Sequence, residues 1–347
     1  MEATSAVINP KNDRIDYLDV AKGIGIFLVV WAHAGGVFSR YIYQFHMPLF
    51  FLISGYLYHS NSSVKEFTIR KVKSIYIPFA FWNCMGLTFR YLIGNANFSI
   101  KSYILTILTL SKDGTFFGAT WFLGALFVIS VLYRILDEIL KSYSHRHLML
   151  LFFFVSLGIC GYEITLPYML SRTLILGMFY AFAVCYKDSI KKLDLSRGGK
   201  IFLAVILAGI FIVFGHYNSA NMGGNSYGYF YAFIVEALAA SYVTIMISSF
   251  INDHIPILSR LLKWLGKNSL YIVLWQFVMF RIVIAIQMIL AGEELGNILN
   301  YYPIYSSDGF WPVVYTAVGL FLSVWIGRIL TIKFWKNLIR KIKKSPQ

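Results

Sequence analysis

Long apolar runs alternate with short polar segments along most of the chain. Because a helix needs about 20 residues to cross a bilayer, we expect the short second run to be tilted or partly re-entrant. A further apolar stretch, residues 103–110, is interpreted as an interfacial part of a loop. The pattern predicts an all-α, polytopic integral membrane protein with about ten transmembrane helices. The predicted spans are residues 18–38, 44–58, 74–94, 116–136, 148–163, 166–186, 201–217, 229–251, 269–291 and 312–332.

Composition supports this class and excludes others. Hydrophobic residues make up 58% of the 347 residues and charged residues 14%, and the mean hydropathy is +0.64. Soluble domains are roughly 45–50% apolar and about 25% charged, so a disordered chain, a coiled coil and an ordinary cytosolic enzyme are excluded. The three cysteines, Cys84, Cys160 and Cys185, lie far apart, and the sequence holds no CxxC motif. We therefore expect neither a disulfide framework nor a metal site.

The basic residues predict how the chain is oriented. The net charge is +15, which in a soluble protein would suggest a nucleic-acid partner. If the N-terminus is cytoplasmic, 22 of the 31 Lys and Arg residues fall in inner loops and tails, six in spans and three in outer loops. This is the positive-inside pattern, so we expect cytoplasmic termini and no nucleic acid. The predicted parts are a cytoplasmic segment 1–17, a transmembrane domain 18–332 and a basic cytoplasmic tail 333–347.

Charged and titratable side chains within a span are costly and are functional candidates. Lys22 and His33 are eleven residues apart, which is almost three helical turns, so they share one helix face and lie about 16 Å apart along its axis. We expect Lys22 near the cytosolic mouth, paired with Asp19, and His33 near the middle of the bilayer. The alternative is an interfacial ion pair and a neutral buried histidine. A histidine at mid-membrane on the same helix face as a cation at the helix mouth favours a functional role.

The second span and the loop after it carry further candidates. The span begins Gln44-Phe-His-Met-Pro48 and contains Ser54-Gly55, two small residues that permit close helix approach. His46 is interpreted either as a loop histidine or as an acceptor contact, with even odds. Arg70 and Lys73 share a helix face on the cytosolic side. From the residues alone, ordinary inner-loop charge is favoured over a clamp for an anionic ligand.

Other polar groups leave two readings open. Arg172, Glu236 and Arg281 lie in different spans and either contact an acceptor or form buried pairs with one another, and we prefer the pairing slightly. The outer loop at 292–311 contains Tyr301, Tyr302, Tyr305 and Trp311, and the outer loop at 218–228 contains Tyr227. Interfacial anchoring explains these aromatic residues more simply than a sugar-binding surface does.

Five stretches of the chain carry a resemblance. Asp19–Gly35 reads DVAKGIGIFLVVWAHAG, Gln44–Tyr58 reads QFHMPLFFLISGYLY, and Arg70 is followed by KVKSIYIPF. Thr120–Phe127 reads TWFLGALF, and Gly266–Phe277 reads GKNSLYIVLWQF. In this order they resemble the membrane-bound acyltransferase-3 family, particularly its fucose 4-O-acetylase-like branch. The expected ten spans also agree with that family.

The resemblance implies transfer of an acyl group, usually acetyl from cytosolic acetyl-CoA, to a hydroxyl of a cell-envelope or exported glycan. The family's motif of a basic residue, ten residues and then His matches Lys22 and His33. Its second basic pair matches Arg70 and Lys73. Lysine replaces arginine at two of these positions, which removes bidentate contact with phosphate. The resemblance also implies a multi-pass protein of the bacterial cytoplasmic membrane.

The late motif of the family usually ends in His, whereas this chain has Gln276, which we interpret as positional. A sugar hydroxyl is a poor nucleophile until a base takes its proton, and a neutral histidine with a pKa near 6.5 suits that task. We therefore expect His33 to be the general base and Lys22, Arg70 and Lys73 to contact the CoA phosphates. A ping-pong route through an acyl-histidine stays open. The candidates for acceptor binding or cavity shape are Asp19, His46, Trp121, Glu236, Ser269 and Gln276.

The expected partners are a glycan or glycolipid acceptor, membrane lipids and, as an open option, a second copy of the chain. The main alternative function is a transporter or flippase of a glycolipid or small polar solute, because intramembrane Arg, Glu and His fit that too. The sequence shows no repeated halves of the kind that many transporters have. A second alternative is a non-catalytic acyl-CoA sensor or assembly subunit, which would bind CoA and tolerate loss of His33.

Overall fold

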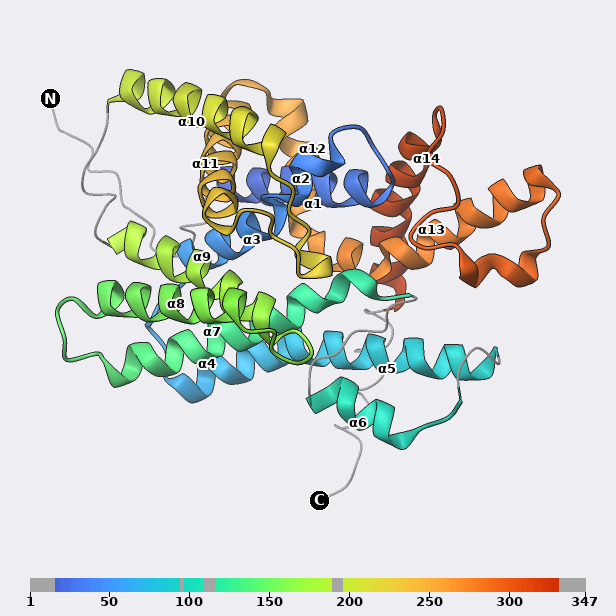
Figure 1. Cartoon of the computed structure of the whole chain (residues 1–347), viewed down its shortest axis with the longest axis horizontal. Helices are drawn as coiled ribbons and strands as arrows, with labels where there is room; N and C mark the ends of the chain where they lie inside the picture. The colour runs from blue at the N-terminus through green and yellow to red at the C-terminus, as the bar shows by residue number, and fades with distance from the viewer. Residues whose placement is uncertain (1–15, 94–96, 109–115, 189–195, 331–347) are drawn as a thin grey trace, which may run out of the picture.

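The computed structural model describes residues 16–93, 97–108, 116–188 and 196–330, and these residues form helices without a β-strand (Figure 1). The predicted all-α class is therefore confirmed for this part of the chain. The first helices are α1 (Asp16–His33), α2 (Ser39–Tyr43), α3 (His46–Tyr56), α4 (Val64–Lys71), α5 (Ile77–Leu92), α6 (Ile100–Leu108) and α7 (Trp121–Ile139). The others are α8 (Arg146–Glu163), α9 (Leu170–Asp188), α10 (Arg197–Tyr217), α11 (Phe230–His254), α12 (Pro256–Lys267), α13 (Ser269–Ala291) and α14 (Trp311–Ala317).

Short irregular helical pieces complete the chain. A π-helical turn, Val72–Tyr76, joins α4 to α5, and a second one, Val318–Leu322, continues α14 to residue 330. The predicted basic tail 333–347 lies outside the described residues, as does all but the last two residues of the predicted segment 1–17.

Six helical segments in the described residues are long and apolar enough to cross a membrane. They coincide with predicted runs that begin at residues 116, 148, 201, 229, 269 and 312. The number of ten spans and the orientation of the termini stay predictions. The six segments are Gly118–Ile139, Arg146–Glu163, Gly198–Tyr217, Phe230–His254, Ser269–Ala291 and Trp311–Leu330.

The other four predicted spans correspond to α1, α3, α5 and α9, which differ from ordinary spans for physical reasons. The second run folds as α3, whose 11 residues extend about 16 Å, half the thickness of the hydrocarbon core. Helix α1 contains charged side chains in its first half, and α9 contains them near both ends. The first run also ends early as a helix, at His33, because Gly35 adopts a positive φ of 74° and turns the chain.

Helices pack closely where a glycine faces a neighbouring backbone. A Cβ added at Gly23 of α1 would lie 2.0 Å from the carbonyl oxygen of Leu262 in α12, and one at Gly266 would lie 2.1 Å from that of Asp19. A Cβ at Gly55 of α3 would lie 2.2 Å from the carbonyl oxygen of Tyr180 in α9. The close approach predicted at Ser54-Gly55 is therefore confirmed. Backbones this close are typical of helix packing in membranes.

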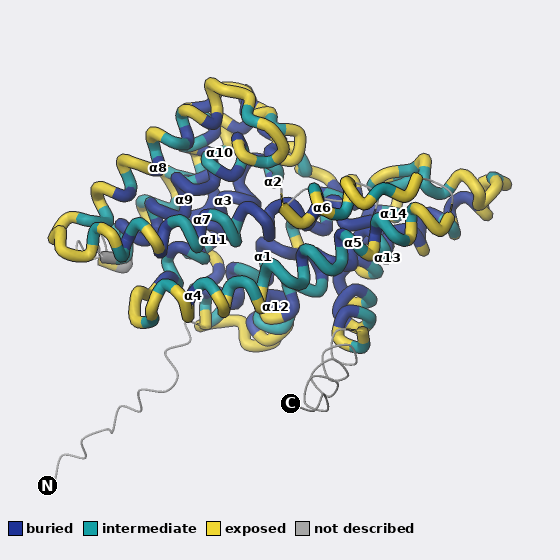
Figure 2. The backbone as a smooth tube through the Cα atoms, turned by 90° about the horizontal axis from the view of Figure 1, so that it is seen from below, coloured by how far each residue is buried: buried dark blue, intermediate teal, exposed yellow. Residues whose placement is uncertain are grey.

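The arrangement places α1 and α3 in the interior of the molecule. Figure 2 shows buried backbone along both helices, whereas α8 and α10 expose one face. The same view shows α4 and α12 at one edge, and α2 and α10 toward the opposite edge. Since α1 packs against α12 near its start and leads into α2 at its end, it connects the two edges.

Candidate active site

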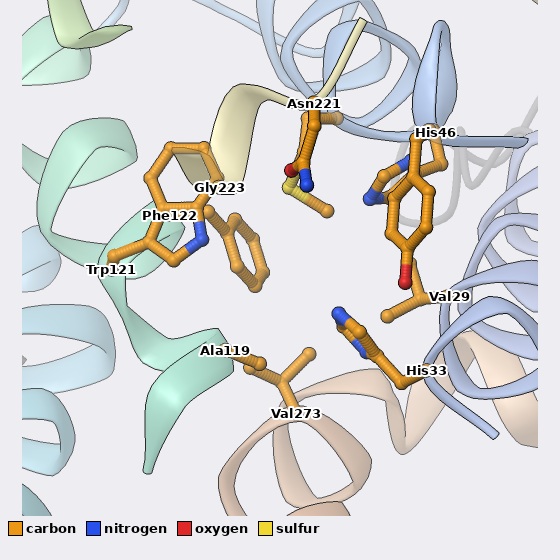
Figure 3. A pocket seen from close by; sticks show the side chains of 11 residues that line it. Val29, His33, His46, Ala119, Trp121, Phe122, Asn221, Gly223 and Val273 are labelled. Carbon is orange, nitrogen blue, oxygen red and sulfur yellow. The ribbon is translucent and has the colours of Figure 1, made fainter. Parts of the chain in front are cut away.

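A small cavity lies where the end of α1 meets the starts of α3 and α7. Its volume of about 40 Å³ holds about two or three water molecules, so it accommodates reacting groups rather than a whole sugar. Figure 3 shows the side chains of His33, His46, Asn221 and Trp121 facing this space from different segments. The lining residues are Val29, His33, Tyr43, His46, Met47, Ala119, Trp121, Phe122, Asn221, Gly223 and Val273.

The turn between α1 and α2 fixes one wall of the cavity. The Tyr43 hydroxyl donates to the carbonyl oxygen of Ala32 at 3.1 Å, and the Trp31 indole donates to that of Val37 at 3.0 Å. The Ser39 hydroxyl donates to the carbonyl oxygen of Gly36. These bonds fold the segment back, so that α2 brings Tyr43 beside the last residue of α1.

His33 and His46 share this cavity and flank the ring of Tyr43. The ring centroids of His33 and Tyr43 are 6.0 Å apart, and those of His46 and Tyr43 are 5.5 Å apart. Nδ1 of His46 lies 2.7 Å from the carbonyl oxygen of Ile42. Because a carbonyl only accepts, Nδ1 carries the proton and Nε2 of the neutral ring is an acceptor. The ring of Phe277 in α13 lies 4.9 Å from the ring of His33.

The segment between α10 and α11 supplies the opposite wall through Asn221 and Gly223. Arg172 of α9 holds this wall, because Nη1 donates to the carbonyl oxygen of Gly223 at 2.7 Å. Its guanidinium also lies 5.2 Å from the centre of the Trp121 ring, a cation–π contact. Arg172 therefore connects two elements of the cavity wall without lining the cavity itself.

The predicted pairing among Arg172, Glu236 and Arg281 is wrong, because their hydrogen bonds run to other groups. The carboxylate of Glu236 accepts from the Asn218 amide at 3.2 Å, and Asn218 begins the segment between α10 and α11. Arg281 donates to the carbonyl oxygen of Ile298 at 2.6 Å. Each of these three side chains thus holds a segment that follows the end of a helix: Arg172 and Glu236 hold the one after α10, and Arg281 the one after α13.

The predicted cations lie away from the cavity, toward the edge of the molecule formed by α4 and α12. Nζ of Lys22 lies 3.5 Å from Oδ1 of Asp19, so the predicted pair is confirmed. Lys22 precedes Gly23, which packs on α12. Arg70 lies in the last turn of α4 and Lys73 follows in the π-helical turn, and both residues are exposed.

A third basic residue, Lys71, lies between these two cations. Burial, together with the neighbouring Arg70, lowers the pKa of Lys71 to about 8, because both disfavour the charged form. Its ammonium lies 5.4 Å from the centre of the Phe67 ring. The segment therefore presents two exposed basic side chains, Arg70 and Lys73, beside a less exposed amine, Lys71.

The remaining candidates on α13 do not line the cavity. Ser269 is the half-buried first residue of the helix. Gln276 is fully buried one residue before Phe277, and its amide oxygen and nitrogen both lack a hydrogen-bond partner within the described residues. The structure thus brings together His33, His46 and Trp121, and it separates them from Lys22, Arg70, Lys73, Glu236 and Ser269.

Sequence reasoning missed several residues near the site. Tyr43, Phe122 and Asn221 line the cavity, and their signals were adjacency to the QFH and TWF stretches and a place in the Asn-rich outer loop. A second buried cluster was also missed. Asp137 accepts from the Tyr58 hydroxyl at 2.6 Å and from Nε of Arg146 at 2.8 Å. No hydrophobic pattern distinguishes such an aspartate, because it ends an ordinary apolar helix.

Comparison with known proteins identifies the family of the chain. The family whose sequence model matches the chain is described as an acyltransferase domain, and the match spans residues 15–332. The nodulation protein NolL of Mesorhizobium japonicum is 33% identical over 141 residues, which cover 36% of this chain and 36% of that protein. The chain thus matches about a third of the length of this relative. No solved structure matches this chain significantly. Because the family match covers nearly the whole chain, the protein belongs to the acyltransferase-3 family.

Proposed function

We propose that the protein is a membrane-embedded O-acetyltransferase that moves acetyl from cytosolic acetyl-CoA to a hydroxyl of a cell-envelope or exported glycan. The observation that carries this proposal is a histidine in a small, partly enclosed cavity at one end of α1, with a cation near the other end. An acyltransferase needs a base beside the acceptor hydroxyl and a site for an anionic donor. Helix α1 supplies a candidate for each.

In this proposal the donor enters from the side of α4 and α12. Its phosphates contact Lys22, Arg70 and Lys73, and Asp19 orients Lys22 through their ion pair. Eleven residues of helix separate Lys22 from His33, which is about 16 Å. An extended pantetheine arm has a comparable length, so phosphates at Lys22 and a thioester at His33 fit one molecule.

At the cavity, His33 takes the proton of the acceptor hydroxyl as the hydroxyl oxygen attacks the thioester carbonyl. The carbon–sulfur bond then breaks, and CoA leaves as the thiolate, which takes up a proton. Trp121 and the unprotonated Nε2 of His46 contact the acceptor, since both line the same space. Glu236 acts indirectly by holding Asn218. The proposed location is the bacterial cytoplasmic membrane, and no metal takes part in the proposed chemistry.

The test measures O-acetyl groups of envelope glycans by NMR in a deletion strain. The strain receives the wild type, His33→Ala, or His254→Ala, an exposed histidine at the end of α11 that serves as a matched control. Removal of a general base costs about 10²–10⁴-fold in rate, so wild type and His254→Ala should restore acetylation and His33→Ala should not.

Two results would contradict the proposal. If His33→Ala restores acetylation at equal membrane expression, His33 is not the base. If the wild type incorporates no label from radioactive acetyl-CoA into any envelope glycan, the reaction itself is wrong and the transporter alternative gains support.

A further inference from the structure

Gln276 is a fully buried amide that makes no side-chain hydrogen bond to any residue that the structure describes. Its side chain is 0% exposed, and Oε1 and Nε2 both lack a hydrogen-bond partner among the described residues. A buried polar group without a partner is destabilising, and native proteins keep few of them. Such a group in a binding protein is explained by a ligand that supplies the missing donor and acceptor.

A second buried glutamine shows what a structural amide looks like in this fold. Gln44 is also 0% exposed and its Oε1 is likewise without a partner among the described residues, but its Nε2 donates to the carbonyl oxygens of Gly215 and Asn218 at 3.2 and 3.1 Å. Gln44 thus joins α2 to the end of α10. Gln276 makes no comparable connection within the part of the chain that the structure describes, so hydrogen bonding among those residues does not explain its polarity.

The position of Gln276 relates it to the catalytic histidine of the proposed function. Its neighbour Phe277 lies 4.9 Å from the ring of His33, and Val273, one turn earlier on α13, lines the cavity. A ligand that extends along α1 from Lys22 to His33 therefore passes the level of Gln276 just before the cavity.

The chemistry of the side chain narrows the ligand. A glutamine amide donates through Nε2 and accepts through Oε1, and it does not exchange protons at neutral pH. The matching ligand groups are a carbonyl and an N–H, as in another amide. Acetyl-CoA carries two amides in its pantetheine arm, and the nearer one is separated from the thioester sulfur by only two carbons.

We propose that Gln276 binds the pantetheine arm of the donor, with Nε2 donating to a carbonyl of the arm and Oε1 accepting one of its N–H groups. The inference rests on the proposed function, because it takes acetyl-CoA as the donor. It assigns the role of arm binding to a residue that cannot act as an acid or base. A neutral histidine at this position would also offer one donor and one acceptor.

The experiment measures binding and stability on the purified full-length protein. Gln276→Met replaces the amide with an unbranched apolar side chain, and Gln44→Met is the matched control. Loss of two hydrogen bonds to the ligand should weaken acetyl-CoA binding by about 10–100-fold. The Tm of ligand-free Gln276→Met should equal or exceed that of the wild type, whereas Gln44→Met should lower it. Gln276→His should bind acetyl-CoA more tightly than Gln276→Met.

Two fragments of the donor separate arm binding from phosphate binding. S-acetylpantetheine contains the arm without phosphates, and adenosine 3′,5′-bisphosphate contains phosphates without the arm. Gln276→Met should weaken binding of the first and leave the second unchanged, and Lys22→Ala should do the reverse.

The outcomes separate the inference from the function on which it rests. If the wild type binds acetyl-CoA and Gln276→Met binds it equally well, the inference alone is wrong. The same holds if Gln276→Met lowers the Tm as Gln44→Met does, or weakens both fragments equally, because the amide then has a structural role. If the wild type binds neither acetyl-CoA nor either fragment, the proposed donor is wrong and the inference falls with it.

Discussion

The contact between α1 and α12 leaves no space for an added methyl group. At Gly23 a new Cβ would lie 2.0 Å from the carbonyl oxygen of Leu262, 1.4 Å less than the 3.4 Å at which ordinary contact begins. The obstructing atom belongs to the backbone, so a rotamer change cannot relieve the clash. Gly23→Ala therefore requires α1 and α12 to separate.

The expected cost follows from two opposing contributions. Alanine gains up to about 1 kcal/mol over glycine as a helix former, whereas overpacking of an interior costs typically 1–3 kcal/mol and sometimes more. Because the clash is with a backbone atom, we expect the upper end, and a net loss of about 2 kcal/mol or more. Separation of α1 from α12 also displaces Lys22, the residue before Gly23, from its place beside α12.

The assay compares the Tm of purified variants in one detergent, together with Kd for acetyl-CoA. Gly209→Ala is the matched control, because a Cβ at Gly209 on α10 meets nothing within 4 Å. We expect Gly23→Ala to lower the Tm by several degrees and to weaken donor binding, and Gly209→Ala to keep or raise the Tm. A Gly23→Ala protein as stable as Gly209→Ala would refute the close contact between α1 and α12.

Three further predictions concern the loops and the cavity wall. The hydroxyls of Tyr301 and Tyr305 donate to the carboxylate of Glu293 and hold its pKa below the usual range. This stabilisation of the loop after α13 is present at neutral pH and is lost as the pH falls through the lowered pKa. Limited proteolysis should therefore cut the loop faster at acid pH, and Glu293→Gln should remove that pH dependence. Asp137→Asn should destabilise the protein by about 1.5–3 kcal/mol, because the buried carboxylate accepts charge-assisted bonds, whereas the exposed Asp253→Asn should not change the Tm. Arg172→Gln should raise KM for the acceptor more than KM for acetyl-CoA, because it removes the contacts of Arg172 with Gly223 and Trp121. An equal rise in the two KM values would contradict a role of this wall in acceptor binding.

The sequence alone predicted the helical class, the apolar runs and the relation between Lys22 and His33. These features depend on the helical period and on the cost of charge in an apolar run, and both are local properties. The pairing of Asp19 with Lys22 is likewise local, because three residues on a helix bring the side chains to one face. The close packing at Gly55 was also foreseen, because a small residue in an apolar run predicts close helix approach.

The neighbours of His33 could not be predicted in the same way. Tyr43, Asn221 and Trp121 come from three segments that are distant in sequence, and no periodicity relates one segment to another. The prediction that Arg172 pairs with Glu236 was wrong for the same reason, since periodicity does not relate the segments that carry them. A buried charge requires a partner, but sequence does not reveal whether another side chain or a loop carbonyl supplies it.

What the sequence by itself determined is therefore the set of helices and the residues that share a helix, because backbone hydrogen bonding and amphipathic spacing act within one segment. The tertiary structure decided which helices touch and which polar groups find partners. Two of the buried glutamines illustrate the difference: Gln44 and Gln276 both occupy apolar runs, yet of these two only Gln44 donates to described carbonyl groups, at the end of α10. Hydrogen bonding requires that two groups meet at a specific distance and angle, and only the assembled fold brings distant groups into that geometry.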